Sequence, residues 1–250
     1  LDTAAAYGEA EARLGSWLAG DKTFKICTKL APPATGEFLV DAAQRSFARS
    51  LRRLRRDRVD ALLVHAASSL LSEEGDALWR WLTDLSMSGE VGGIGVSLYD
   101  AVEIDALLQR YTPDWVQVPT SVFDQRLLRS GHLARLWGAG ISVQIRSVLL
   151  QGLVTAEPDA LPEAFAGAIL PLNKLDVAAQ ATGDTKIDLA LSFAATLADV
   201  ELAVLGVTTA DELRQCINIF RRPVVTEWAQ FACVDPAVVD PRRWPIGLKL

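Results

Sequence analysis

Four side chains have the types needed to transfer a proton to an oxygen atom. Asp2 and Tyr7 lie in the opening stretch LDTAAAYG, Lys29 follows the run FKICT, and His65 follows VDALLV. The unperturbed pKa of a tyrosine is about 10, so tyrosine is a poor acid near neutral pH. A nearby lysine ammonium favours the phenolate, an aspartate keeps the ammonium in place, and a neutral histidine can orient a carbonyl oxygen. The four residues together predict a set that protonates an oxygen while another group delivers hydride.

These residues need elements that bring them to one place, and the chain alternates between two kinds of segment. Short apolar runs rich in β-branched residues predict strands over residues 24–30, 59–66, 91–98, 115–122, 141–149 and 201–207. Segments with helical periodicity lie between or after them, over residues 8–20, 37–54, 75–89, 100–111, 132–140, 186–197 and 209–220. Such alternation predicts right-handed βαβ units and a parallel sheet, hence an α/β fold.

A (β/α)8 TIM barrel is the architecture that this alternation favours. The six runs and a strand end at residues 1–3 make seven strands, whereas a barrel has eight in about 250 residues. A doubly wound sheet is the alternative, and it usually has a glycine-rich turn after its first strand. The comparable cluster GGIGVS at 92–97 lies inside a predicted strand. We therefore expect one barrel domain over residues 1–250, with residues 225–250 as a tail over or beside it.

Composition narrows the class of partner. The chain has 250 residues, half of them hydrophobic, and a net charge of −6, so bulk charge favours neither nucleic acid nor an anionic membrane. Cys27, Cys216 and Cys233 are odd in number and far apart, which favours neither a disulfide framework nor a metal site. No apolar run reaches the roughly 20 residues of a membrane helix. We expect a cytoplasmic protein, and the sequence does not set its oligomeric state.

In a barrel the active site lies at the carboxyl ends of the strands. Besides the four residues above, Ser97, Gln117, Arg146 and Ser147 lie at such ends. Each of them singly has a structural explanation, since a buried polar group needs only a hydrogen-bond partner. Their convergence on one barrel mouth favours a functional site.

The order of these motifs resembles the aldo-keto reductase family over residues 1 to about 220. LDTAAAYGEAEARLG resembles its signature of an Asp followed five residues later by Tyr and Gly, and CTKL resembles its lysine strand. SLRRLRRDRVDALLVHA resembles the stretch that leads to the family's catalytic histidine. GGIGVSLYD and VQVPTSVFDQR resemble its Gly-Val-Ser strand end and its nicotinamide-binding glutamine strand. The resemblance implies that Tyr7 donates the proton, Lys29 and Asp2 tune it, and His65 orients the substrate.

The resemblance also implies a cofactor, NADPH or NADH, and reduction of an aldehyde or ketone to an alcohol, or the reverse. Ser97 and Gln117 would hold the nicotinamide carboxamide, and Ser147 would contact the phosphates. The implied partner is a small carbonyl compound, and no metal is expected. A second class of function stays open, a barrel that binds cofactor or a protein without useful turnover.

Two departures from the family concern the nicotinamide. Leu98 follows Ser97 where many relatives have Asn, which removes a hydrogen bond to the carboxamide. Arg146 stands where many relatives have an aromatic residue over the ring. A guanidinium stacks less well on the positive oxidised ring than on the neutral reduced ring. Arg146 is therefore expected to favour the reduced cofactor, or else to turn to a phosphate.

A third departure lies in the segment 205–216, which matches the family's last cofactor-binding segment in position. Gly206 and Glu212 stand where many relatives have basic residues that bind the 2′-phosphate, so a strict NADP preference is not expected. Thr208 and Thr209 could still bond to the adenosine ribose or phosphate. Thr209 also fits a helix N-cap before ADEL.

The resemblance leaves the start of the chain and the substrate open. The family has a strand and a helix before its Asp and Tyr, and they are missing here. The sequence is then a fragment or omits an upstream segment, or it forms an altered barrel that another chain completes. RSVLLQGLV (146–154), VFDQRL and DPRRW (240–244) resemble a bacterial subgroup that often accompanies polysaccharide or sugar-nucleotide synthesis. That subgroup implies a sugar-derived carbonyl substrate.

Three further features received other interpretations. The basic run RSLRRLRRDR (49–58) is predicted as the solvated face of a helix. Residues 155–185, rich in Pro, Ala and Gly, are predicted as a lid or a partly disordered loop. Trp228 and Trp244 either line the substrate pocket or pack against the outside of the barrel.

Overall fold

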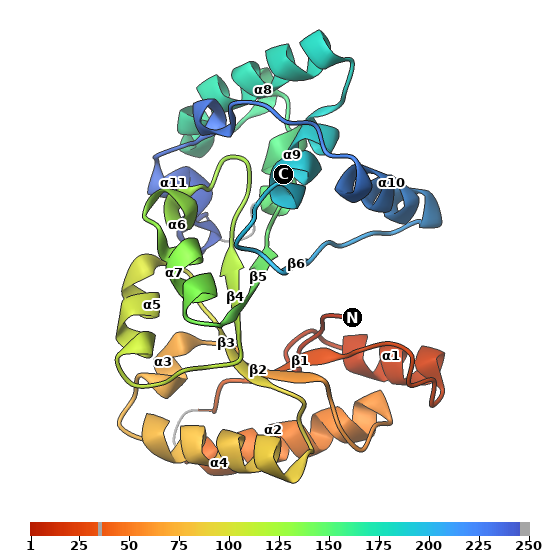
Figure 1. The fold of residues 1–250 in the computed structure, drawn as a ribbon, viewed down its shortest axis with the longest axis vertical. Helices are drawn as coiled ribbons and strands as arrows, with labels where there is room; N and C mark the ends of the chain where they lie inside the picture. The colour runs from red at the N-terminus through yellow and green to blue at the C-terminus, as the bar shows by residue number, and fades with distance from the viewer. Residues whose placement is uncertain (35–36, 246–250) are drawn as a thin grey trace. The chain divides into compact units, whose positions relative to one another are not determined.

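Six short parallel strands follow one another in the sheet in the order of the sequence. A computed structural model describes residues 1–34 and 37–245 (Figure 1). Its strands are β1 Cys27–Leu30, β2 Ala61–Val64, β3 Ile94–Ser97, β4 Trp115–Pro119, β5 Ser142–Arg146 and β6 Leu202–Ala203. Parallel strands in chain order with helices between them are the arrangement of a (β/α)8 barrel. The predicted α/β class is confirmed, and the chain contains part of such a barrel.

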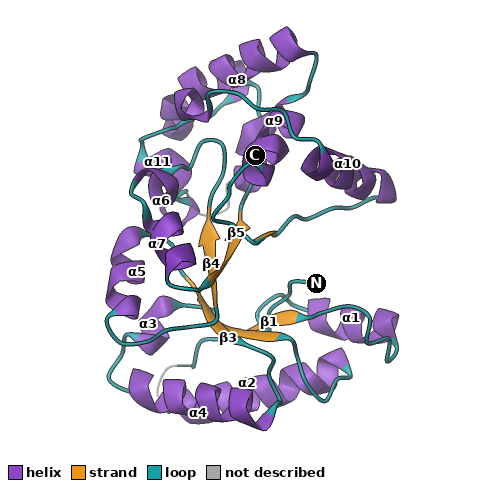
Figure 2. Cartoon of the chain, viewed as in Figure 1, coloured by secondary structure: helices purple, strands orange, loops and turns teal. Residues whose placement is uncertain are grey.

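Helices occur at every predicted position to within a few residues (Figure 2). They are α1 Ala10–Leu18, α2 Leu39–Leu54, α3 Ala67–Leu70, α4 Gly75–Ser88, α5 Ala101–Leu108, α6 Arg126–Arg129, α7 His132–Gly138, α8 Ile169–Thr182, α9 Lys186–Ala195, α10 Ala210–Arg221 and α11 Pro236–Val239. Short 3-10 helices cover Leu150–Thr155, Pro158–Ala160, Glu163–Ala168, Trp228–Phe231 and Pro241–Arg243. In the part of the chain that the structure describes, no helix is both long enough and apolar enough for a bilayer crossing.

The chain divides into two units. The first comprises Leu1–Gln117 with Gly138–Val143, and the second comprises Val118–Trp137 with Gln144–Leu250. The first unit therefore contains β1 to β3, α1 to α5, the part of β4 that ends at Gln117, and Ser142 and Val143 of β5. A single barrel domain stays a prediction.

The first unit is built around strands that are apolar on both faces. Every residue of β2 and of β3 is buried, as the run VDALLV predicted. Helix α2 packs beside α4 (Figure 1) and buries a stripe that includes Phe47 and Leu54. Arg49, Arg52 and Arg55 of the basic run are exposed, which confirms a solvated face for these residues.

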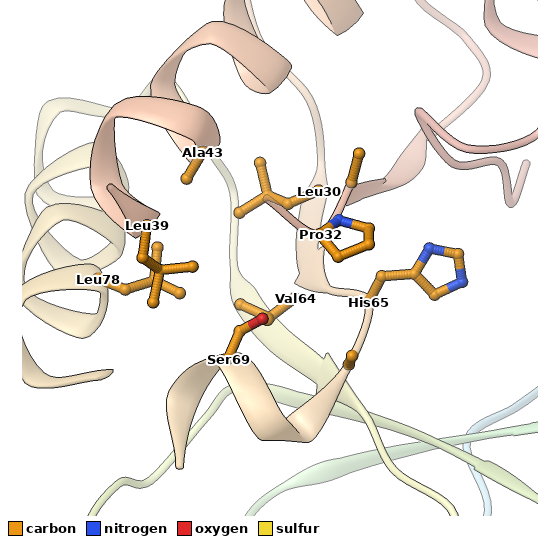
Figure 3. A pocket seen from close by; sticks show the side chains of 10 residues that line it. Leu30, Pro32, Leu39, Ala43, Val64, His65, Ser69 and Leu78 are labelled. Carbon is orange, nitrogen blue, oxygen red and sulfur yellow. The ribbon is translucent and has the colours of Figure 1, made fainter. Parts of the chain in front are cut away.

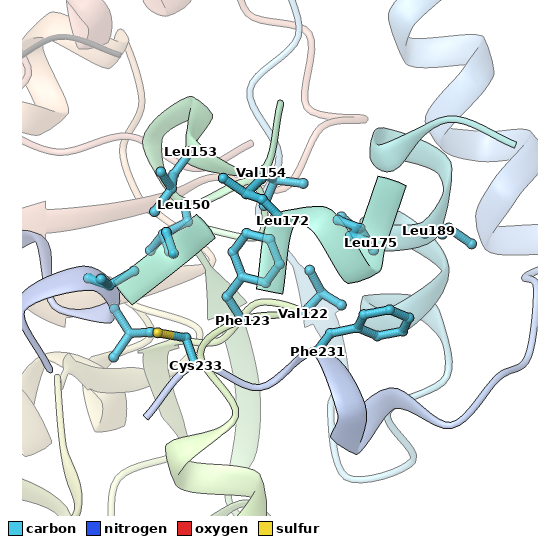
Figure 4. Packing of buried hydrophobic residues seen from close by; sticks show 14 of the residues in the cluster. Val122, Phe123, Leu150, Leu153, Val154, Leu172, Leu175, Leu189, Phe231 and Cys233 are labelled. Atoms are coloured by element: carbon cyan, nitrogen blue, oxygen red, sulfur yellow. The ribbon is translucent and has the colours of Figure 1, made fainter. Parts of the chain in front are cut away.

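The second unit has a core of its own, formed by segments from β4 onward (Figure 4). The prediction of a partly disordered loop over residues 155–185 is wrong, because this segment contains α8. A lid role for the segment stays a prediction. Leu172, Leu175 and Ala179 recur at helical spacing and are buried in this core. Pro171 lies in the first turn of α8, where the missing N–H breaks no helical hydrogen bond.

Aromatic packing accounts for the two tryptophans near the end of the chain. The ring of Trp228 lies 5.7 Å from that of Phe193, and the ring of Trp244 lies 4.9 Å from that of Phe165. The Trp244 indole also donates a hydrogen bond of 3.0 Å to the carbonyl of Val238. Both tryptophans therefore pack within the second unit.

The motifs DQR (124–126) and DPRRW (240–244) each contain an Asp–Arg ion pair, and the two pairs have the same geometry. Asp124 is buried and accepts two hydrogen bonds from the guanidinium of Arg126, at 2.8 and 2.9 Å. Asp240 is buried and accepts from Arg242 in the same way. Burial raises the pKa of Asp240, but the hydrogen bonds and charge of Arg242 outweigh it and hold that pKa below its usual value. These motifs therefore have a structural role in the second unit.

Candidate active site

The opening residues run parallel to β1. The Thr3 N–H donates to the carbonyl of Cys27 at 2.9 Å, and the Ala5 N–H donates to the carbonyl of Lys29 at 3.0 Å. Asp2 and Cys27 form an isolated parallel bridge. The predicted strand end at residues 1–3 is thus confirmed, and it brings Asp2 to the strand that carries the lysine.

Lys29 is buried, with 1% of its side chain exposed. Its Nζ donates to Asp2 Oδ2 at 2.6 Å and to the carbonyl of Thr3 at 3.1 Å. An unpaired ammonium in such a place would cost several kcal/mol, of the order of the desolvation penalty of an ion. The ion pair with Asp2 is therefore required for Lys29 to remain buried with its charge.

Tyr7 lies on the turn between the opening segment and α1. Its N–H donates to the carbonyl of Ala4 at 3.0 Å, and Gly8 follows with φ of +53°, a conformation that glycine adopts without strain. The Tyr7 ring centroid lies 5.3 Å from Lys29 Nζ and 5.7 Å from the His65 ring, edge to face. Tyr7 is 47% exposed. The structure thus brings Asp2, Tyr7, Lys29 and His65 together and leaves the tyrosine accessible.

The His65 ring is directed away from an apolar pocket in the first unit (Figure 3). Leu30, Leu39, Val64 and Leu78 line this pocket, and their side chains point toward one another. The apolar residues around this pocket therefore pack behind the backbone of His65. The imidazole ring lies edge to face with the Tyr7 ring.

Ser97 at the end of β3 and Gln117 in the middle of β4 lie side by side. They are register partners, and both are buried. Gln117 Nε2 donates to Asp2 Oδ1 at 2.9 Å, so the Asp2 carboxylate binds Lys29 through one oxygen and Gln117 through the other. Sequence analysis assigned Gln117 to the cofactor and missed this contact across 115 residues of chain. Its position beside other polar residues was the available signal.

Cys27 lies next to the carboxylate of Asp2 at the start of β1. Burial raises the pKa of the Cys27 thiol to about 12, and the negative charge of Asp2 adds to this effect. The thiolate is the reactive form of cysteine, so this thiol is held unreactive at neutral pH.

We expect Cys27 to resist alkylation by iodoacetamide between pH 7 and 10 in the folded protein. The thiolate fraction rises tenfold per pH unit and remains near one per cent at pH 10 for a pKa of about 12. Peptide mass spectrometry after a timed reaction measures the modification, and the urea-unfolded chain is the control. Rapid labelling of folded Cys27 at pH 8 would contradict the placement of its thiol beside Asp2.

The remaining predicted site residues belong to the second unit. Arg146 ends β5, and its Nη1 lies 3.5 Å from the hydroxyl of Ser147. Ser147 has φ of +59°, a left-handed conformation that is uncommon for serine. Gly206 follows β6 and is exposed. These residues lie on strand ends or on the segments after them, as the sequence indicated.

Glu212 forms hydrogen bonds with both Thr208 and Thr209. The Glu212 N–H donates to Thr209 Oγ1 at 3.2 Å, which confirms Thr209 as the N-cap of α10. The Glu212 carboxylate accepts from the N–H of Thr208 at 2.6 Å and from its hydroxyl at 3.0 Å. These hydrogen bonds lower the pKa of Glu212. The negatively charged carboxylate of Glu212 therefore lies against Thr208, one of the two threonines that the sequence predicts to contact the adenosine end of a cofactor.

The described residues contain no group of three or more His, Cys, Asp or Glu side chains placed to hold a metal ion.

Comparison with solved structures identifies the fold. Aldo-keto reductase AKR11C1 from Bacillus halodurans, in its holo form, aligns with a TM-score of 0.74 and 20% identity over 98% of this chain and 85% of its own. Glycerol dehydrogenase AKR11B4 from Gluconobacter oxydans aligns with a TM-score of 0.64 and 20% identity over 90% of this chain and 82% of its own. At these identities the likeness establishes a shared fold.

A search of curated protein sequences gave no match. The model of the Aldo/keto reductase family matches residues 1–234, which is most of the chain and includes all the predicted site residues. This family consists of oxidoreductases that reduce carbonyl groups with nicotinamide cofactors. The chain belongs to the aldo/keto reductase family.

Proposed function

We propose that this protein reduces an aldehyde or ketone to an alcohol with NADH or NADPH, and that Tyr7 is the proton donor. One observation carries the proposal: the half-exposed Tyr7 ring contacts His65 and lies 5.3 Å from the buried ammonium of Lys29. An accessible phenol beside a fixed positive charge is the arrangement that general-acid catalysis by tyrosine requires.

Each residue of the set has a distinct task in this proposal. A nicotinamide cofactor, when bound, supplies the hydride. The Tyr7 hydroxyl gives its proton to the carbonyl oxygen, and the Lys29 ammonium stabilises the phenolate that remains. Asp2 keeps Lys29 charged and in place through the 2.6 Å ion pair. His65 donates a hydrogen bond that orients the carbonyl oxygen before transfer.

The polar pair on β3 and β4 fits a nicotinamide carboxamide. Ser97 and Gln117 supply hydroxyl and amide groups on neighbouring strands, and Gln117 contacts Asp2. A primary amide both donates and accepts hydrogen bonds, so these side chains suit it. In the second unit, Ser147 keeps the proposed contact with the phosphates, and Arg146 keeps its two alternatives, the reduced ring or a phosphate.

The substrate that we propose is a small, hydroxyl-bearing or sugar-derived carbonyl compound. The sequence resemblance to a polysaccharide-associated subgroup supports it, and one structural relative is named a glycerol dehydrogenase. We also propose a cytoplasmic location, which three free cysteines favour because a reducing compartment keeps thiols unpaired. The proposal requires neither nucleic acid nor a membrane as partner.

Titration of the purified chain with NADH and with NADPH, followed by tryptophan fluorescence, tests the proposal first. We expect micromolar binding of at least one cofactor and cofactor oxidation when glyceraldehyde or another sugar-derived aldehyde is added. Cofactor binding without turnover across a panel of aldehydes and ketones would favour the binding module instead. Failure to bind either cofactor would contradict the proposed reductase.

Glu212 is expected to disfavour NADPH. Its carboxylate lies on Thr208 and repels a 2′-phosphate, so Glu212→Lys should raise the preference for NADPH over NADH about five- to tenfold. The ratio of the two dissociation constants measures this preference. Glu163→Lys, the same charge change at an exposed position of the same unit, is the control. If Glu212→Lys and Glu163→Lys had the same ratio of dissociation constants, Glu212 would not set the preference between NADPH and NADH.

A further inference from the structure

The carboxyl group of Glu11 is buried, and the proposed chemistry does not use it. Glu11 is 1% exposed. Its Oε1 accepts a hydrogen bond of 2.7 Å from Thr28 Oγ1, and its Oε2 lies 4.0 Å from Arg53 Nε. Burial of a carboxyl group opposes folding unless its partners compensate, and an apolar residue often stabilises such a place as well or better. Stability alone therefore does not explain a buried carboxyl group at position 11.

Glu11 connects the two elements that carry the tyrosine and the lysine. It lies in the first turn of α1, four residues after Tyr7, whereas Thr28 lies in β1 directly before Lys29. Successive side chains of a strand point to opposite faces. Thr28 therefore faces α1 while Lys29 faces the active site, and the Thr28–Glu11 hydrogen bond joins α1 to the back of the lysine strand.

Arg53 holds the turn that follows Tyr7. Its Nη2 donates to the carbonyl of Gly8 and, at 3.2 Å, to the carboxylate of Glu9. Its side chain is 23% exposed, although it belongs to the basic run whose other members on this helix face solvent. Gly15 of α1 allows the close approach, because a Cβ there would clash with the Arg53 carbonyl oxygen.

We propose that Glu11, Thr28 and Arg53 are positioning residues that set the place of the Tyr7 hydroxyl relative to Lys29. Tyr7 is nearly half exposed, so burial of its side chain does not fix the position of the ring. The backbone of residues 7–11 therefore has to hold the ring in place. Thr28 and Glu11 join that backbone to β1, and Arg53 joins it to α2. The inference rests on the proposed role of Tyr7 as proton donor.

Two pairs of variants test the proposal in the full chain. Thr28→Val removes the hydroxyl and keeps the shape, while Thr28→Ser keeps the hydroxyl. Arg53→Gln removes the guanidinium from a partly exposed position, and Arg52→Gln is its exposed neighbour on α2. We expect Thr28→Val and Arg53→Gln to lower kcat about ten- to a hundredfold, with cofactor affinity within about twofold of the wild type. Thr28→Ser and Arg52→Gln should retain kcat.

A spectroscopic readout separates this proposal from the proposed function. The chain has three tyrosines, so the Tyr7 resonance in a 13Cζ-tyrosine NMR spectrum can be assigned by its loss in Tyr7→Phe. The Tyr7 ring lies 5.3 Å from Lys29 Nζ and 5.7 Å from the His65 ring, so its displacement should change the 13Cζ chemical shift of Tyr7 at a fixed pH in Thr28→Val and in Arg53→Gln. Unchanged chemical shifts in both variants would overturn the positioning role even if the wild type is an active reductase. Changed chemical shifts in both variants of a protein whose wild type has no turnover would support the positioning role and reject the proposed reductase.

If Thr28→Val unfolds at the assay temperature, as thermal melting would show, Arg53→Gln against Arg52→Gln carries the comparison alone. The Arg53 side chain is not part of the core, so this variant is expected to fold.

Discussion

Tyr7→Phe is expected to lower kcat for carbonyl reduction by about 10²- to 10⁴-fold, the usual contribution of a positioned general acid. Phenylalanine keeps the ring that lies against His65 and Lys29 but has no proton to give. The affinity for NADH or NADPH should remain within about twofold, because the change removes one hydroxyl and leaves the ring packing intact. Stopped-flow or steady-state oxidation of the reduced cofactor measures the loss.

Tyr111→Phe is the matched control for this result. Tyr111 is buried, and its hydroxyl binds Asp76 at 2.6 Å, remote from the proposed chemistry. Its loss should alter stability and leave kcat intact. Equal turnover in Tyr7→Phe and in the wild type would show that another group donates the proton.

Asp2→Ala is expected to destabilise the protein by about 3 kcal/mol, because it leaves the ammonium of Lys29 buried without its ion-pair partner. Lys29→Met should cost less, since the Asp2 carboxylate is partly exposed and also accepts from Gln117. The double variant should regain most of the stability lost in Asp2→Ala, because both charges are then absent. All three variants should lose carbonyl reduction.

Urea unfolding of the four proteins measures the coupling between the two residues as a double-mutant cycle. A coupling free energy near zero would mean that the 2.6 Å pair does not hold Lys29 in its buried place. Asp2→Asn keeps the shape of the side chain and separates loss of charge from loss of packing. Its stability should lie between those of the wild type and Asp2→Ala.

Local patterns in the sequence predicted the order of the elements and indicated that Asp2, Tyr7, Lys29 and His65 could lie together. The run VDALLV is apolar on both faces, and β2 is indeed buried between two parallel neighbours. The motifs LDTAAAYG and CTKL indicated that Asp2, Tyr7 and Lys29 converge, and the structure brings these three side chains together. Strand and helix periodicities are short-range properties, so a sequence carries them directly.

The segment 155–185 shows that amino-acid composition by itself does not predict secondary structure. Proline and small residues over 155–185 indicated a loop, yet Leu172, Leu175 and Ala179 lie at helical spacing and are buried in α8. Proline at the start of a helix costs little, so its presence did not exclude one. The spacing of the apolar residues was the better signal there.

Only the tertiary structure decided which polar groups are partners. Gln117 binds Asp2 across 115 residues of chain, Arg53 turns from a solvated basic run to the turn after Tyr7, and Glu212 occupies Thr208. Side chains of one type have the same local pattern whether they face water or a buried partner. A hydrogen bond depends on distances of about 3 Å between atoms, and these distances exist only after strands and helices far apart in sequence have packed. The sequence alone therefore determined the elements and the residue types available for the proposed chemistry, and the packed structure determined which of those residues contact one another.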